Sequence, residues 1–280
     1  MAEKERIGVI GVGRMGMAIT KHLIKNGYAV IAQDIDQETL ESARAAGAQT
    51  VKTPAEVGKI ARFVIIAVGY DDEAAAVMLD RNGLLETMGV GSVIAVSSTC
   101  TPDHVMMLAE RARAKDIEVL DSPICRGQRA ADDGTMLTLC GGKAEVIELA
   151  KPIYGTFCSD IAHLGDVGAG QFGKAMNNYL LWVNGIALIE AGRLSEANGM
   201  DLVKLRDALL MSSGASDALK NWENVSFTWA LKDMQIVAKM ADKAGLSLPI
   251  AGAIKELVKE GRRIKNSNPP DWTGRKARGA

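Results

Sequence analysis

Residues 7–16 read Ile-Gly-Val-Ile-Gly-Val-Gly-Arg-Met-Gly. An apolar run precedes the glycines and a helical pattern follows them, so the expected order is strand, turn and helix. Gly11 would permit the tight bend, Gly13 would let a phosphate approach the backbone, and Gly16 would let helix and strand pack closely. The bland alternative is a glycine-rich turn in an unrelated α/β fold. We expect a dinucleotide to contact Gly11, Val12, Gly13, Arg14, Met15 and Gly16, because the helix start offers free N–H groups to its phosphates.

Asp34 supports that interpretation, since it ends the second apolar run about twenty residues after the glycines. A carboxylate there can accept hydrogen bonds from the ribose hydroxyls and would repel a 2′-phosphate. Asp36 adds to this repulsion, or it only caps the following helix. No Arg or Lys occurs between residues 33 and 40 to hold such a phosphate. The sequence therefore favours NAD over NADP.

The order of apolar runs and helical patterns predicts the fold class. Parallel strands buried on both faces are expected at 7–10, 29–32, 63–68, 92–96 and 118–120. Helical patterns take over near residue 165, at 169–198, 202–211, 231–244 and 250–264. The prediction is an α/β Rossmann-like parallel-sheet domain followed by an all-helical domain. The expected domains are 1–164 for the dinucleotide, 165–265 for substrate or oligomerisation, and a loose basic tail at 266–280.

Composition excludes several classes of protein. The formal net charge of −1 over 280 residues gives no electrostatic reason to expect a nucleic-acid or membrane partner. The start of the chain carries mixed charges and lacks a long apolar segment, so no secretory signal is expected. The four cysteines are far apart and form no CxxC, which favours a reduced, cytoplasmic setting without a metal site.

A lysine near the start of the long helical pattern is the candidate catalytic group. Lys174 and Asn178 lie four residues apart, so they share a helix face. A partly buried lysine can exchange a proton with a substrate hydroxyl as hydride leaves or arrives, and Asn178 can orient either partner. Taken alone, the pair is also consistent with an ordinary solvated helix face.

Four separated motifs together resemble the β-hydroxyacid dehydrogenase family, which includes 3-hydroxyisobutyrate dehydrogenase and tartronate semialdehyde reductase. The resemblance runs from Ile7 to about Ile264. The motifs are the glycine turn, the run Asp121-Ser122-Pro123-Ile124-Cys125-Arg126-Gly127, the run Gly168-x-Gly170-x-x-x-Lys174-x-x-Asn177-Asn178, and Lys232-Asp233. Any one of them alone would be unspecific.

The resemblance implies a role for each matching residue. Lys174 would be the general acid/base in the interdomain cleft, with Asn178 beside it. The residues on the cofactor side would include Val68, Thr99 and Lys232. The substrate would be held by Ser98, Ser122, Pro123, Cys125, Arg126 and Gly127. The bland alternatives are a helix cap for the Ser98-Thr99 pair and a surface charge pair for Lys232-Asp233.

The second motif departs from the family's usual Asp-Ala-Pro-Val-Ser-Gly-Gly. Ser122, Cys125 and Arg126 replace an Ala, a Ser and a Gly of the loop that receives the substrate carboxylate in the family. Arg126 can bind a carboxylate, sulfonate or phosphate through its planar fork, or it can point to solvent with Arg129. Cys125 is expected to be a pocket-wall residue rather than a nucleophile, since no base adjoins it in sequence.

The expected function is hydride transfer between a nicotinamide cofactor and a small acidic substrate, in a homodimer or homotetramer. A reductase of the same fold acting on a sulfonate-bearing aldehyde or an imine is one rival, although imine reductases usually lack the lysine. A non-catalytic NAD-binding module is the other. The cluster Trp222, Phe227 and Trp229 packs a helical core or walls the substrate pocket. The sequence leaves the substrate and the direction of reaction open.

Overall fold

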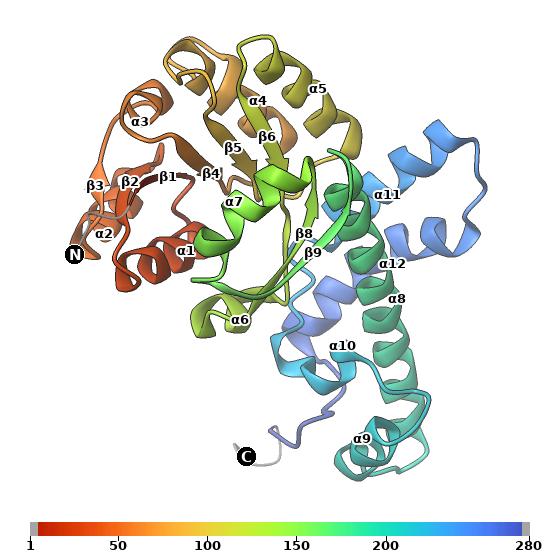
Figure 1. The fold of residues 1–280 in the computed structure, drawn as a ribbon. Coiled ribbons are helices and arrows are strands. Elements are labelled where there is room, and N and C mark those ends of the chain that lie inside the picture. Colours follow the sequence, from red (N-terminus) through yellow and green to blue (C-terminus); the bar gives the residue numbers. More distant parts are fainter. Residues whose placement is uncertain (1–4, 276–280) are drawn as a thin grey trace. The chain divides into compact units, whose positions relative to one another are not determined.

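The computed structural model describes residues 5–275 and divides into two compact units, Met1–Lys174 and Ala175–Ala280. The predicted architecture of a Rossmann-like unit followed by a helical unit is confirmed. Figure 1 labels most of the elements of both. In the part of the chain that is described, no helix combines the length and hydropathy needed to cross a membrane.

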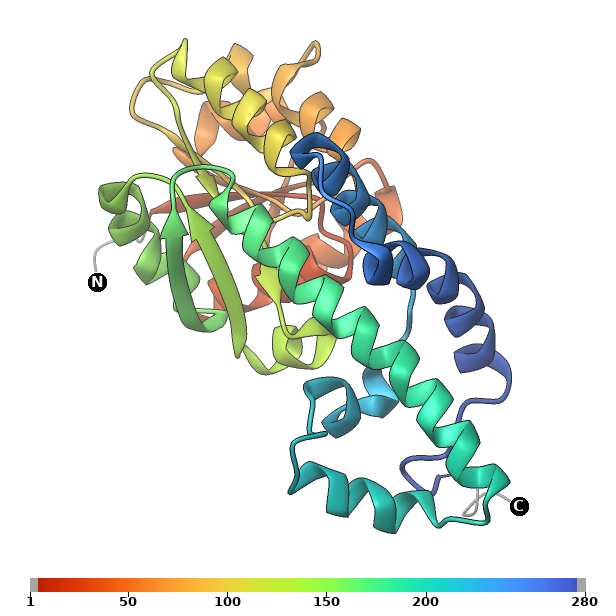
Figure 2. The same ribbon diagram turned by 90° about the vertical axis from the view of Figure 1, so that its right-hand side faces the viewer.

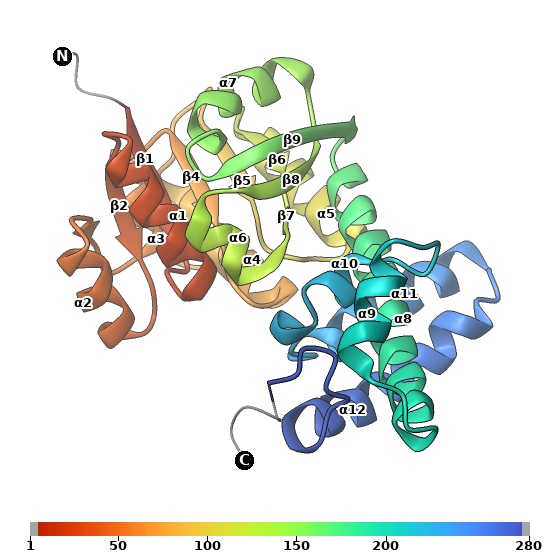
Figure 3. The same cartoon turned by 90° about the horizontal axis from the view of Figure 1, so that it is seen from below.

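The first unit is built on one twisted sheet in the order β3-β2-β1-β4-β5-β6-β8-β7, with β9 paired to β8. The first six strands in this order are parallel, while β8 runs antiparallel to β6 and β7. Their bounds are β1 Arg6–Ile10, β2 Ala29–Gln33, β3 Gln49–Thr50, β4 Phe63–Ile66, β5 Val93–Val96, β6 Glu118–Asp121, β7 Ile124–Cys125, β8 Met136–Gly141 and β9 Cys158–Gly165. Sequence patterns predicted five of these strands; Figure 3 shows β8 and β9, which they missed.

Helices cover both faces of the sheet and give two separate apolar cores. Within β1, Ile7 and Val9 contribute to one core and Ile10 to the other, as the alternation of side chains along a strand requires. One core also contains α1 Arg14–Lys25, α2 Gln37–Ala45, α6 Gly127–Asp133 and α7 Ala144–Tyr154. The other contains α3 Pro54–Ile60, α4 Asp71–Leu79, η1 Leu84–Glu86 and α5 Pro102–Arg113.

The second unit is entirely helical in its described part. The long helix α8, Ala169–Ala197, begins in the first unit and continues into the second as one helix, which Figure 2 shows unbroken. It is followed by α9 Leu202–Leu210, α10 Asp217–Lys220, η2 Trp222–Asn224, α11 Ala230–Ala244 and α12 Pro249–Ser267. Their core contains Trp182, Trp222 and Phe227.

The structure differs from the expected loose tail over residues 266–275. Helix α12 runs to Ser267, and the following segment returns to the core of the second unit. Trp272 is fully buried there and donates from Nε1 to the Leu188 carbonyl oxygen at 3.1 Å. An indole buried with its N–H paired anchors the segment. Residues 276–280 of the expected tail lie outside the described residues.

Candidate functional site

The glycine turn joins β1 to α1 at the carboxyl edge of the parallel strands. Gly11 has φ +82°, and a Cβ there would lie 2.6 Å from the Ala67 carbonyl oxygen. A Cβ on Gly16 would lie 1.9 Å from the Gly11 carbonyl oxygen. Backbone atoms cannot move away as a flexible side chain can, so both positions require glycine for the fold itself.

Gly13 plays a different part, because a Cβ added there would meet no heavy atom within 4 Å. It is the N-cap of α1, no side chain caps this helix, and the first turn contains no acidic residue. The amino end of α1 therefore presents its positive dipole to open space. These residues fit the pyrophosphate of a dinucleotide, which would supply the missing acceptors and negative charge.

Asp34 stands at the end of β2, beside the turn. Its Oδ2 accepts from the Val12 amide at 2.7 Å, and its Oδ1 accepts from the Asp36 amide at 3.0 Å. Each carboxylate oxygen has a further lone pair, so ribose hydroxyls can still donate to it. Asp36 accepts from the Glu38 amide at 3.0 Å and caps α2, which is the structural role that the sequence offered as the alternative.

Val68 and Ser98 meet where β4 and β5 end. The Val68 amide donates to Ser98 Oγ at 2.8 Å, and Ser98 Oγ donates to the Ile66 carbonyl oxygen at 3.4 Å. Ser98 is buried and Thr99 is half-buried. The hydroxyl of Ser98 therefore links two strand ends at the sheet edge that carries the glycine turn.

The second motif lies mostly inside the first unit. Ser122 is fully buried, and its Oγ forms a hydrogen bond with the Tyr154 hydroxyl at 2.6 Å. That hydroxyl also bonds Ser97 Oγ at 2.8 Å, and burial raises the pKa of Tyr154 well above its ordinary value. Pro123 and Cys125 are buried as well. The Ser122 side chain is thus engaged in the core, and its backbone is paired as well, since its amide donates to the Val96 carbonyl oxygen and its own carbonyl oxygen accepts from Thr138 Oγ1.

The Arg126 side chain is paired with residues of β9, the outermost strand next to β8. Its Nη1 lies 2.6 Å from Asp160 Oδ2 on β9, and it also donates to Ser159 Oγ at 2.9 Å. The Arg126 guanidinium holds the pKa of the Asp160 carboxyl below its ordinary value. Arg126 has φ +81°, a left-handed conformation that a glycine adopts without cost. Arg129 pairs separately, with Asp133 at 3.8 Å.

Replacing Arg126 by glycine is expected to change substrate choice more than stability. The variant loses an ion pair that solvent screens, and it relieves the left-handed conformation of the arginine, so the two effects on stability oppose each other. We expect a free energy of unfolding within about 1 kcal/mol of wild type and a changed ranking of acids by kcat/KM. The matched control is Asp160→Asn, which weakens the tether and keeps the guanidinium. An identical ranking in Arg126→Gly would show that Arg126 does not touch substrate.

The first turn of α8 is attached to the same sheet edge by two residues to which the sequence assigned no role. Asp121 Oδ2, at the end of β6, accepts from the amides of Gly168 and Gln171 at 2.9 and 3.0 Å. The Gln171 side chain donates to the Ser98 carbonyl oxygen at 2.9 Å. Lys174 follows three residues later, half-buried. The signal in the sequence that could have revealed Asp121 is a charged residue at the end of an otherwise apolar strand.

The other predicted residues belong to the second unit. Asn178 is buried, and its Oδ1 accepts from the Asn177 side chain at 3.0 Å. Lys232 Nζ lies 5.8 Å from the centre of the Trp229 ring. Asp233 is buried and accepts from the Trp182 indole at 2.9 Å, so it joins α11 to α8 and is not a surface charge.

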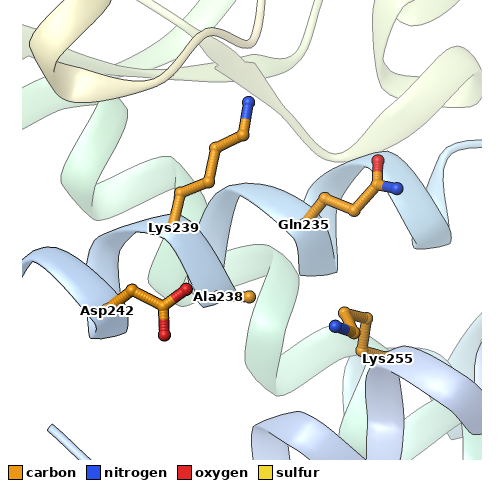
Figure 4. A pocket seen from close by; sticks show the side chains of 5 residues that line it. All are labelled: Gln235, Ala238, Lys239, Asp242 and Lys255. Carbon is orange, nitrogen blue, oxygen red and sulfur yellow. The ribbon is translucent and has the colours of Figure 1, made fainter.

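The aromatic cluster divides between core and surface. Trp222 and Phe227 are buried in the helical core, whereas 44% of Trp229 is exposed. Figure 4 shows a shallow pocket on the surface of α11 and α12, lined by Gln235, Ala238, Lys239, Asp242 and Lys255. It contains none of the predicted site residues.

Family models match both parts of the chain. The NAD binding domain of 6-phosphogluconate dehydrogenase matches residues 6–165. The model described as NAD-binding of NADP-dependent 3-hydroxyisobutyrate dehydrogenase matches residues 168–269. The fold and the glycine turn therefore define an NAD(P)-binding oxidoreductase. The chain belongs to the 3-hydroxyisobutyrate dehydrogenase family of hydroxyacid dehydrogenases.

Individual relatives agree with this assignment. The NAD-dependent L-serine dehydrogenase of Pseudomonas aeruginosa is 32% identical over 216 residues, which cover 77% of this chain and 72% of that protein. The mitochondrial 3-hydroxyisobutyrate dehydrogenase of Rattus norvegicus is 33% identical over 76% of this chain and 64% of its own length, just under two thirds. The Mycobacterium tuberculosis 3-hydroxyisobutyrate dehydrogenase structure with L-serine has a TM-score of 0.85 at 21% identity, covering 99% of both chains, and shares the fold.

Proposed function

We propose that this protein transfers hydride between a nicotinamide cofactor and a small β-hydroxy acid, or the matching aldehyde or keto acid, with Lys174 as general acid/base. One observation carries the proposal. The first turn of α8, which ends just before Lys174, is hydrogen-bonded to Asp121 at the end of β6 and to the Ser98 carbonyl oxygen just after β5. This is the sheet edge at which the glycine turn follows β1. Ligands of open α/β sheets bind at that edge.

The chain's own residues would bind, orient and move a proton. The nicotinamide cofactor supplies the hydride acceptor or donor when it is bound. Gly13 and the start of α1 would hold its pyrophosphate, and Asp34 its adenine ribose. In the oxidation direction Lys174 Nζ would take the proton of the substrate hydroxyl, and in reduction it would return that proton. Asn178, one turn further along α8, would orient Lys174 or the substrate.

The substrate is proposed to be an acid. L-serine and 3-hydroxyisobutyrate, the compounds in the relatives' names, both carry a carboxylate and a β-hydroxyl group. The loop at Cys125, Arg126 and Gly127 would receive the carboxylate, as it does in the family. A panel of hydroxy acids, aldehyde acids, sulfonates and imines, followed by NADH absorbance, tests the proposal. Turnover of imines alone would favour the imine rival, and cofactor binding without any turnover would favour the non-catalytic module.

We further propose that NAD is preferred over NADP, because Asp34 would face the adenine ribose. The variant Asp34→Asn tests this preference, because its amide oxygen can still accept from the Val12 amide while the negative charge is lost. We expect the preference for NADH over NADPH to fall about tenfold or more, equal to about 1.4 kcal/mol. Asp36→Asn, which changes only the cap of α2, is the control. Unchanged cofactor selectivity in Asp34→Asn would refute this role.

A homodimer or homotetramer in the cytoplasm is proposed as the working form. Apolar side chains on α8, such as Leu180 and Leu194, are more than half exposed, which favours contact with another copy. The four cysteines are buried and none forms a disulfide within the described part of the chain, which suits a reducing compartment. Sedimentation of the purified protein tests the assembly, and a single species at 29.8 kDa would contradict it.

A further inference from the structure

Asp121 is a fully buried carboxylate, and the proposed chemistry does not use it. It is the last residue of β6, and two glycines leave room for it. A Cβ on Gly141 would lie 3.1 Å from Asp121 Oδ2, and a Cβ on Gly170 would lie 3.0 Å from Asp121 Cγ. Gly170 of the Gly168-x-Gly170 motif therefore leaves space for the Asp121 side chain to pack against α8.

The Asp121 carboxylate caps the start of α8 with a single oxygen. Oδ2 accepts from the amides of Gly168 and Gln171 at 2.9 and 3.0 Å, whereas Oδ1 is buried with no hydrogen-bond partner among the described residues. A buried carboxylate is costly for a capping role that Ser or Thr could fill. Burial raises the pKa of Asp121 to about 6, and the Gln171 and Gly168 amides oppose this rise.

Gln171 completes the attachment from the helix side. Its side chain is 1% exposed and uses both of its functional atoms. Nε2 donates to the Ser98 carbonyl oxygen at 2.9 Å, and Oε1 accepts from the Cys100 amide at 2.9 Å. The Gln171 side chain therefore ties α8 to the segment just after β5, and the Asp121 side chain ties α8 to the end of β6. The two attachments hold one helical turn against two neighbouring strand ends.

Lys174 lies three residues after Gln171, and side chains three apart on a helix are neighbours. A rotation or shift of this first turn would thus displace the Lys174 amine directly. We propose that Asp121 and Gln171 are positioning residues that fix the first turn of α8 and thereby set the place of Lys174 at the sheet edge. The inference rests on the proposed function of Lys174, but it concerns two buried residues whose side chains bond other parts of the protein.

Kinetics and hydrogen exchange of the full-length protein test this inference together. Gln171→Ala removes both side-chain bonds, and Asp121→Ala removes the cap. We expect kcat on the best acid of the panel to fall about 100-fold, since a displacement of about 1 Å can cost that much. The dissociation constant for NADH should stay within about threefold, or about 0.7 kcal/mol. Amides 168–175 should exchange faster in both variants.

Two variants separate positioning from general loss of stability. Asp121→Asn keeps an oxygen that can accept from Gly168 and Gln171, so it should restore kcat to within about threefold of wild type. Thr87→Val removes a hydrogen bond to the Ala55 carbonyl oxygen, 2.7 Å long, which joins other elements of the same unit. It should lower stability without changing kcat or the exchange of α8. Like Gln171→Ala, it removes a side-chain hydrogen bond to a backbone group far along the chain.

The pH dependence of stability provides a readout that a neutral cap would not give. The folded pKa of Asp121, about 6, exceeds its ordinary value of 3.8, so its contribution to stability is full below pH 3.8 and is lost as pH rises through 6. We expect the urea midpoint of wild type to fall relative to Asp121→Asn over that window. Cys140 on β8 stays neutral there, since burial raises its pKa to about 11, and Asp166 before α8 is exposed to solvent.

The inference and the proposed function fail in different ways. If wild type turns over no compound of the panel, the proposed function is wrong, but the faster exchange of amides 168–175 expected in the two variants can still be measured. Normal protection of amides 168–175 in Gln171→Ala and Asp121→Ala would overturn the attachment. Lost protection with an unchanged kcat would overturn the positioning of Lys174.

Discussion

Lys174→Ala is expected to bind NADH with wild-type affinity and to lose about 100- to 10,000-fold in kcat, the range that a positioned general acid/base contributes. Under the proposed mechanism, the variant lacks the amine that would take the hydroxyl proton in oxidation and return it in reduction. The loss should appear in kcat and kcat/KM alike, because the interaction belongs to the transition state. Stopped-flow absorbance at saturating NADH measures both terms.

Two controls sharpen this result. Lys174→Arg keeps the charge but not a proton that can be released, so it should be almost as inactive as Lys174→Ala. Lys239→Ala removes a lysine of α11 that lines the pocket of Figure 4, and it should leave kcat unchanged. If Lys174→Ala retained more than about a tenth of wild-type kcat, the amine would not be the acid/base of this reaction.

A pair of glycine variants should separate folding from cofactor binding within one turn. Gly16→Ala would force a Cβ to 1.9 Å from the Gly11 carbonyl oxygen, so we expect it to destabilise the protein by about 3 kcal/mol or more. Gly13→Ala meets no atom within 4 Å and has an ordinary negative φ, so it should cost no more than about 1 kcal/mol. Urea unfolding without cofactor measures both values.

Gly13→Ala, which should stay folded, is the variant that we expect to lose affinity for the cofactor. A methyl group on Gly13 would occupy the open space in front of α1, where we place the pyrophosphate. We expect the affinity of Gly13→Ala for NADH to fall about tenfold or more, or about 1.4 kcal/mol. Gly89→Ala, another glycine whose added Cβ meets nothing, is the control and should keep full affinity. Wild-type affinity in Gly13→Ala would move the dinucleotide away from the turn.

Local patterns in the sequence predicted the fold where one segment determines its own environment. The parallel strands β1, β2, β4, β5 and β6 are continuous apolar runs because both of their faces are buried. Strand β9 escaped prediction because much of it is exposed, and Ser159, Asp160 and His163 interrupt any apolar run. The segment at 266–275 looked loose because its one large apolar side chain, Trp272, lies among Pro, Asn and Gly in the sequence.

The parts of the candidate site that depend on distant partners were beyond sequence reasoning. The direction of Arg126 is set by Asp160, 34 residues away, and the roles of Asp121 and Gln171 arise from bonds spanning 47 to 73 residues. The family resemblance pointed to Ser122 as a substrate residue, yet Tyr154 occupies its hydroxyl. Residue type and order locate a site, whereas the choice of hydrogen-bond partner depends on the folded chain.

A crystal structure of the protein with NADH and an acid from the active panel tests the central claim most directly. The distance to measure joins Lys174 Nζ to the substrate oxygen that gains or loses the proton. We predict a hydrogen bond of about 2.6–3.2 Å, with the pyrophosphate at Gly13 and the start of α1. A Lys174 amine directed into solvent while the acid lies against the nicotinamide would contradict the account.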